Sequence, residues 1–166
     1  VPSGEAAEAR LRFFLSVVGQ VRGFAHRLEL ADVLPIEYLA LDFGMEPSAL
    51  ADLRPTTTGT EGRGEGSDLA GKLVGVYTLT ETAGARAKDA IERLYPQCTV
   101  QVNSDTVSTT ALATLARTAD IFVFAWRSSS HQAFYCIKDA LGGRDPIYAA
   151  GKGTASIVNA VRDAAK

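Results

Sequence analysis

From Lys72 to the end of the chain, short apolar segments alternate with longer segments whose apolar residues recur every three or four positions. The short segments are 73–79, 99–102, 121–126 and 146–149, and the longer ones are 83–94, 109–117, 131–141 and 154–164. Segments of the first kind are typical of buried strands, and those of the second kind are typical of amphipathic helices. Residues 121–126 (IFVFAW) are apolar almost without interruption, which favours a strand covered on both faces of a sheet.

Four strand–helix pairs in succession restrict the topology of this segment. Each return from one strand to the next needs a helical crossover, and such crossovers are nearly always right-handed and connect parallel strands. We therefore predict an α/β fold for residues 69–166, a Rossmann-like parallel four-stranded sheet with flanking helices.

The first third of the chain has a different character. Apolar residues recur at helical spacing over 5–34, with charged residues on the opposite face. After Pro35, residues 36–53 predict a second short helix or an irregular segment. Residues 56–67 contain no apolar residue and many glycines and threonines, so they cannot bury themselves. The predicted organisation is a helical segment (1–55), a flexible Gly/Thr-rich linker (56–68) and an α/β domain (69–166).

Composition narrows the classes of partner. The 166 residues carry a formal net charge of -2, so no basic field covers the whole molecule and we do not expect nucleic acid as a partner. No run approaches the roughly 20 apolar residues of a membrane helix, and we expect no membrane contact. Cys98 and Cys136 form no CxxC pair, which indicates a reducing cytoplasm. The chain starts at Val1 and enters a helical pattern at once, so we expect a piece of a longer protein.

The loops after the predicted strands are the places to look for a site, because open parallel sheets bind ligands outside the carboxyl ends of their strands. Three of the four loops lead directly into a predicted helix, whose free N–H groups and dipole favour a negative charge. The candidate ligand-binding residues after the first and third strands are Thr78, Thr80, Thr82, Trp126, Arg127, Ser128, Ser129, Ser130 and His131. Those after the fourth strand are Gly151, Lys152, Gly153, Thr154 and Ser156.

These residue types suggest specific roles. Arg127 and Lys152 would supply positive charge, the serines would supply hydrogen bonds, and Trp126 would offer a surface on which a base could stack. We expect the loops of the two cations to converge on one pocket that favours negative charge. The alternative is that the serines and threonines serve only as helix N-caps, which would explain Thr80 or Ser130 taken singly.

Several better-known sites are absent from the sequence. Residues 151–154 (GKGT) lack the leading glycine and spacing of a P-loop, and no GxGxxG follows the first strand. A flavodoxin-like phosphate loop fits 78–82 better, although Glu81 stands where a glycine would be wanted. No GxSxG is present, and His131 and Cys136 do not have metal-ligand spacing. We predict no metal site and no catalytic residue. The sequence does not identify a cofactor more closely than as a nucleotide-like ligand.

Four short motifs in the last three fifths of the chain suggest a family. They are Ala119-Asp120, Ser130-His131-Gln132-Ala133, Ile137-Lys138 and the segment 153–156, and the apolar fourth strand lies between the last two. With these motifs, residues 72–166 resemble the small bacterial Rossmann-like domain catalogued as domain-of-unknown-function family 2325. The resemblance implies a ligand-sensing module found beside bacterial defence and regulatory genes, with Ser130, His131 and Lys138 as its defining site residues. Lys152 departs from the more serine-rich loop of that family.

Three hypotheses follow for the function. The first is a non-catalytic module of a larger bacterial protein that binds or senses a small anionic, nucleotide-like molecule, with anti-phage defence as the role that the resemblance implies. The second is a protein-interaction or oligomerisation domain without a ligand, such as a homodimer that depends on Leu15 and Phe24. The third is a nucleotide-processing enzyme that uses His131, and the sequence supports this hypothesis less than a function without catalysis.

Overall fold

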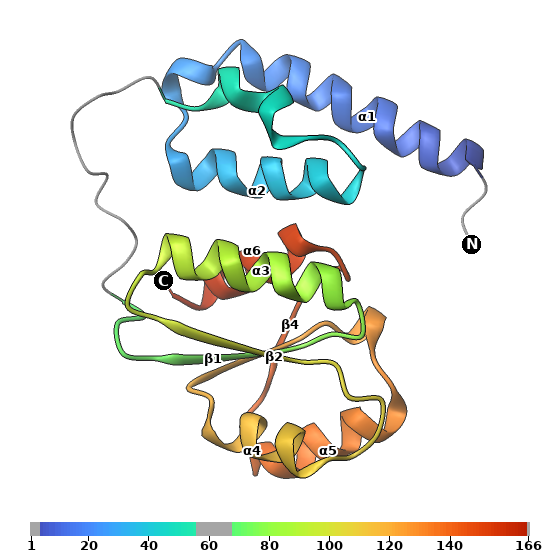
Figure 1. Cartoon of the computed structure of the whole chain (residues 1–166), viewed down its shortest axis with the longest axis vertical. Helices are drawn as coiled ribbons and strands as arrows, with labels where there is room; N and C mark the ends of the chain where they lie inside the picture. Colours follow the sequence, from blue (N-terminus) through green and yellow to red (C-terminus); the bar gives the residue numbers. More distant parts are fainter. Residues whose placement is uncertain (1–3, 56–67, 166) are drawn as a thin grey trace. The chain divides into compact units, whose positions relative to one another are not determined.

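The computed structural model of the protein describes residues 4–55 and 68–165. The chain divides into two compact units, residues 1–62 and residues 63–166, which Figure 1 colours from blue to teal and from green to red. The predicted linker, 56–68, lies outside the described residues except for Asp68. None of the helices in the two described ranges combines the length and the apolar character that a membrane crossing needs.

The first unit is built from two helices and two short 3-10 helices. They are α1 (Gly4–Arg22), η1 (Ala25–Arg27), α2 (Leu30–Asp42) and η2 (Pro47–Leu53). The core of the unit is a cluster of buried side chains, namely Phe14, Val18, Val33, Ala40, Leu50 and Leu53. The Arg54 guanidinium donates two hydrogen bonds of 2.7 Å to the buried Glu37 carboxylate, which fastens the end of η2 to α2.

The helix boundaries in this unit differ from those predicted. The continuous helical spacing over 5–34 is divided between two helices, because α1 ends at Arg22 and the Gly23 N–H bonds the Gln20 carbonyl in a tight turn. The second helix begins at Leu30 and continues through Pro35 rather than after it. Pro35 lies in the second turn, where the missing N–H removes only one intrahelical bond.

The second unit contains a four-stranded parallel sheet. Its strands are β1 (Leu73–Tyr77), β2 (Thr99–Asn103), β3 (Ile121–Phe124) and β4 (Ile147–Tyr148). The helices that follow them are α3 (Glu81–Leu94), α4 (Thr110–Thr118), α5 (His131–Leu141) and α6 (Thr154–Ala164), and the short η4 (Trp126–Ser128) lies between β3 and α5. The strand order is β2-β1-β3-β4, and each adjacent pair is parallel. The predicted Rossmann-like α/β fold is confirmed.

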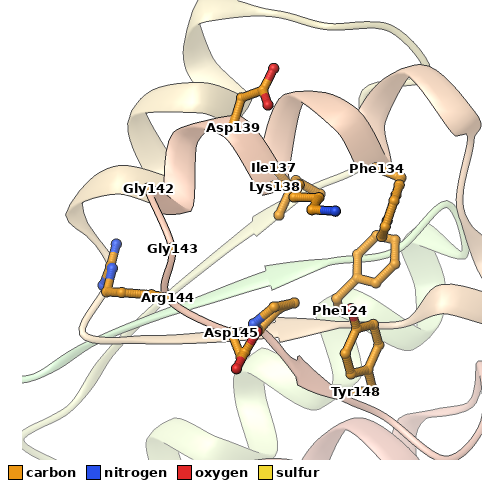
Figure 2. Close-up of a pocket in the computed structure, with 11 residues that line it drawn as sticks. Phe124, Phe134, Ile137, Lys138, Asp139, Gly142, Gly143, Arg144, Asp145 and Tyr148 are labelled. Atoms are coloured by element: carbon orange, nitrogen blue, oxygen red, sulfur yellow. The ribbon is translucent and has the colours of Figure 1, made fainter.

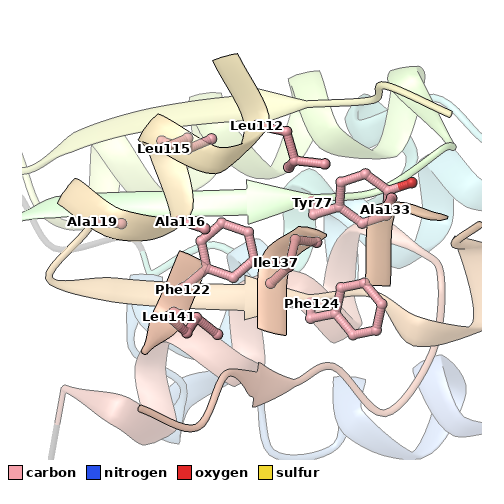
Figure 3. Close-up of a cluster of buried hydrophobic side chains, with 10 residues drawn as sticks. All are labelled: Tyr77, Leu112, Leu115, Ala116, Ala119, Phe122, Phe124, Ala133, Ile137 and Leu141. Carbon is pink, nitrogen blue, oxygen red and sulfur yellow. The ribbon is translucent and has the colours of Figure 1, made fainter. Parts of the chain in front are cut away.

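The helices cover both faces of this sheet. Helix α3 packs beside α6 on one face, and α4 packs beside α5 on the other (Figure 1). One core cluster of this unit, larger than the cluster of the first unit, lies between the sheet and α4 and α5 (Figure 3), and it consists of Tyr77, Leu112, Leu115, Ala116, Ala119, Phe122, Phe124, Ala133, Ile137 and Leu141. Because the chain passes from β1 to β2 on one side and then to β3 on the other, the strand order reverses between β1 and β3.

Candidate functional site

The loops after β1 and β3 meet where the strand order reverses, and hydrogen bonds join them. The Leu79 N–H donates to the Ser128 carbonyl at 3.0 Å, and the hydroxyls of Thr80 and Ser128 lie 2.9 Å apart. Thr78 is buried, and its hydroxyl accepts the Thr80 N–H at 3.1 Å. Thr82 is exposed on the first turn of α3. Of the three threonines of the expected phosphate loop, Thr80 joins the two loops, and Thr78 stabilises the turn that contains Thr80.

The other serines of the loop after β3 also have partners within the protein. The Ser129 hydroxyl donates to the Trp126 carbonyl at 2.8 Å. The Ser130 hydroxyl donates to the Thr106 carbonyl at 2.6 Å and accepts the Ala133 N–H at 3.1 Å. Ser130 is therefore the N-cap of α5. These bonds fix the loop in front of α5 and hold the backbone of Trp126, with which the loop begins.

A pocket of about 660 Å³ lies beside this loop, between the ends of β3 and β4 and the first half of α5. We call it the Trp126 pocket. Its lining residues are Phe124, Trp126, Ser129, Ser130, His131, Phe134 and Tyr148. Trp126 is 49% exposed and Tyr148 is 53% exposed, so both rings offer free surface to a ligand.

A second pocket of about 460 Å³ continues along the second half of α5 (Figure 2), and we call it the Lys138 pocket. Its lining residues are Phe124, Phe134, Ile137, Lys138, Asp139, Gly142, Gly143, Arg144, Asp145, Pro146 and Tyr148. Three aromatic residues line both pockets. The ring centroid of Phe124 lies 5.8 Å from that of Phe134 and 5.9 Å from that of Tyr148.

The structure brings together only some of the predicted site residues. Trp126, Ser129, Ser130 and His131 line the Trp126 pocket, and Lys138 lines the other. The remaining predicted residues line neither of these two pockets, and they are Thr78, Thr80, Thr82, Arg127, Ser128, Gly151, Lys152, Gly153, Thr154 and Ser156.

The two expected cations therefore do not converge on either pocket. The Arg127 guanidinium instead lies 5.0 Å from the centroid of the Trp126 ring, in a cation–π contact. Lys152 is exposed in the loop before α6. In that loop Gly151 packs closely against Ser156, because a Cβ on the glycine would lie 2.7 Å from the serine hydroxyl. Thr154, the first residue of α6, is buried.

Sequence reasoning missed the aromatic residues that dominate both pockets. Phe124 and Tyr148 were assigned to strands and Phe134 to a helix, where apolar side chains need no further explanation. The available signal was the position of Tyr148 in a short fourth strand, which proves to be the edge of the sheet. An aromatic residue on an edge strand has only one neighbouring strand to cover it.

The acid that follows β2 is held by its neighbours. Thr109 and Asn103 donate hydrogen bonds to the Asp105 carboxylate, and these bonds lower the pKa of Asp105 from its ordinary value. A carboxylate stabilised in its charged form is poorly suited to exchange protons near neutral pH. Across residues 4–55 and 68–165, no three His, Cys, Asp or Glu side chains gather closely enough to hold a metal ion.

Comparison with known proteins identifies a family for the whole chain. The family model described as DpdD-like matches residues 1–160, and so covers both units. No curated protein and no solved structure matches the chain significantly. The comparison names this uncharacterised domain family and does not name domain-of-unknown-function family 2325, to which only residues 72–166 showed a resemblance. Because the match spans nearly all of the sequence, the chain belongs to the DpdD-like family.

Proposed function

We propose that the α/β unit binds a small molecule that combines an aromatic ring with a negative charge, as a nucleotide does, in the Trp126 pocket. The observation that carries this proposal is the set of rings in the pocket. Trp126, Phe134 and Tyr148 line one cavity at the carboxyl ends of β3 and β4, where open parallel sheets bind ligands. Stacking on such rings favours planar ligands of any base type.

The charged part of the ligand would lie at the start of α5. His131 and Gln132 occupy the first turn, where backbone N–H groups have no carbonyl partner within the helix. The Ser130 hydroxyl occupies the Ala133 N–H, so the remaining free donors belong to these two residues. Together with the positive end of the helix dipole and the His131 ring, they suit a phosphate or carboxylate.

We place this binding module in a larger bacterial protein, as a sensor rather than an enzyme. The sensing role and the association with anti-phage defence come from the resemblance to family 2325. The internal bonds of Ser128, Ser129 and Ser130 support a preformed pocket. A preformed pocket lowers the entropy cost of ordering the loop when a ligand binds.

Trp126 provides a direct test, because it is the only tryptophan of the chain and lines the proposed site. AMP and GMP should each change its fluorescence in a saturable way, whereas ribose phosphate, which has no base, should not. Replacing Tyr148 with alanine should weaken nucleotide binding about tenfold, since one stacking surface is lost. Phe24→Ala is the control and should keep the affinity, because Phe24 is 57% exposed in the helical unit and lines neither pocket.

Two results would contradict the proposal. One is the absence of any fluorescence response to mononucleotides by a folded protein. The other is a loss of binding in Lys152→Ala but not in Tyr148→Ala, which would favour the loop near α6 over the aromatic pocket.

A second candidate function, self-association, is favoured by the surface of the helical unit. Phe13, Val17 and Leu39 are 73%, 40% and 37% exposed, and they line an apolar pocket of about 430 Å³ formed by α1 and α2. Leu15 and Phe24, on which the homodimer hypothesis first depended, are also exposed. Apolar surface of this kind is typical of contacts between proteins.

A further inference from the structure

The two pockets along α5 meet at a shared aromatic wall. Phe124, Phe134 and Tyr148 line both, and Figure 2 shows these three side chains at the Lys138 pocket. A planar group in the Trp126 pocket would therefore leave a second apolar surface free in the Lys138 pocket. One ring system would fill only one of these two adjoining pockets, which we call together the aromatic groove.

Lys138 stands beside this shared wall. Figure 2 shows its amino group directed toward the side chains of Phe134, on the same helix, and Phe124. The side chain is exposed and, within the described part of the chain, forms no hydrogen bond or ion pair. An unpaired ammonium group in this position suits a phosphate that joins two halves of a ligand.

The far end of the Lys138 pocket has a different chemistry. Arg144 lines it, but its guanidinium donates to the Ala116 and Ala119 carbonyls at 2.8 and 2.9 Å and is not free to bind an anion. Asp145 lines the same end, and a carboxylate can only accept hydrogen bonds. This end therefore favours a ring that carries N–H donors, as purine bases do, and disfavours a further phosphate.

We infer that the ligand is a free dinucleotide, in which one base lies in the Trp126 pocket, the other lies in the Lys138 pocket, and Lys138 contacts the linking phosphate. This inference rests on the proposed function and specifies its ligand class. A single-stranded nucleic acid has the same two-base unit, but Asp139 and Asp145 both line the Lys138 pocket, and their carboxylates would repel any phosphate beyond the linking one. The structure thus assigns the groove to two nucleotides and not to a longer strand.

The test compares ligands of increasing length on the full chain by Trp126 fluorescence and calorimetry. The linear dinucleotides pApA and pGpG should bind about tenfold tighter than AMP and GMP, because they gain one stacked base and one charge-assisted contact. Oligonucleotides of five residues should bind no tighter than the dinucleotides. In Lys138→Ala the ratio of the two affinities should fall, because the contact to the linking phosphate is lost while the second stacked base remains. Lys72→Ala is the matched control, because Lys72 precedes β1 at the opposite end of the sheet, and it should keep the full ratio.

The outcomes separate this inference from the proposed function. If no nucleotide of any length changes Trp126 fluorescence, both are overturned. If mononucleotides and dinucleotides bind equally well, the proposed function stands and the dinucleotide inference fails. Tighter binding of the longer strands would also overturn it, since the groove would then serve single-stranded nucleic acid. If the ratio of the two affinities were unchanged in Lys138→Ala, the assignment of the linking phosphate to Lys138 would be overturned.

Discussion

At the scale of single residues, Arg144 shows how one side chain can join two helices. Its guanidinium donates to the carbonyls of Ala116, Arg117 and Ala119 at the end of α4, at 2.8, 2.9 and 2.9 Å. The last carbonyls of a helix have no intrahelical donor, and the negative end of the dipole favours a cation there. The Arg144 Nε also reaches the Leu141 carbonyl at the end of α5, at 3.4 Å.

Replacing Arg144 with alanine should lower the free energy of unfolding by about 1–3 kcal/mol, because carbonyls at the end of α4 lose charge-assisted donors. Urea denaturation followed by Trp126 fluorescence would measure the change. The matched control is Arg93→Ala, which removes an exposed ion pair with Asp89 one helical turn away. That variant should lose no more than about 0.5 kcal/mol. Equal stability of the two variants would show that the Arg144 bonds contribute nothing.

The sequence predicts which polar residues lie in the loops after the strands, but it does not predict the groups with which they form hydrogen bonds. For Ser130, both ligand binding and capping were consistent with the sequence. The structure shows the cap, together with a bond to Thr106, which lies 24 residues earlier in the chain. Which residue lies opposite a hydroxyl depends on how separate loops approach in space, and no local pattern contains that information.

At the scale of elements, the close approach of α3 to the sheet depends on a glycine in its first turns. A Cβ at Gly84 would lie 2.7 Å from Cγ1 of Val102 and 3.0 Å from Cγ2 of Thr78. Both neighbours are branched side chains with little freedom to move. The glycine therefore sets the distance between the helix and the ends of β1 and β2.

Replacing Gly84 with alanine should destabilise the protein although alanine favours helices. Overpacking costs about 1–3 kcal/mol, whereas the gain in helix propensity is at most about 1 kcal/mol. The control is Gly19→Ala in α1, where a Cβ would meet nothing within 4 Å, and that variant should gain stability. Thermal unfolding monitored by circular dichroism would compare the two. A higher melting temperature for Gly84→Ala would mean that the helix shifts without cost.

Helices with one clear apolar face could be predicted closely. The predicted ranges 131–141 and 154–164 coincide with α5 and α6. An N-cap residue precedes each helix, and the helical spacing of apolar residues stops where each helix ends. Over 5–34 the helical spacing runs on without a gap, so the break after Arg22 was hidden. A glycine lowers helix stability only slightly, and tertiary packing decides whether the chain turns there.

At the scale of the whole molecule, each unit has its own buried cluster. Every member of the smaller cluster, such as Phe14 and Leu53, belongs to residues 1–62, and every member of the larger one, such as Tyr77 and Phe124, belongs to residues 63–166.

The aromatic groove could not be predicted from the sequence, because it depends on how the elements assemble. It depends on which face of the sheet α5 covers and on β4 being the edge strand, and both follow from the strand order.

The division into two compact units leads to a prediction about the two candidate functions. A chain reduced to residues 68–166 should fold with a cooperative thermal transition, because the larger cluster and the sheet remain complete. It should also keep the Trp126 fluorescence response to nucleotides. Self-association, measured by analytical ultracentrifugation of the full chain, should be lost in the shortened chain.

Phe13→Ser in the full chain distinguishes the surface from the mere presence of the helical unit. Phe13 is 73% exposed, so the substitution should leave folding intact and weaken association by removing apolar area from the contact. Ser16→Ala, an exposed change on the same helix, should leave association as it is. A full chain that stays monomeric at high concentration would exclude the homodimer and leave ligand binding as the remaining proposal. If the shortened chain failed to fold, the larger cluster would need the helical unit, and the two functions could not belong to independent domains.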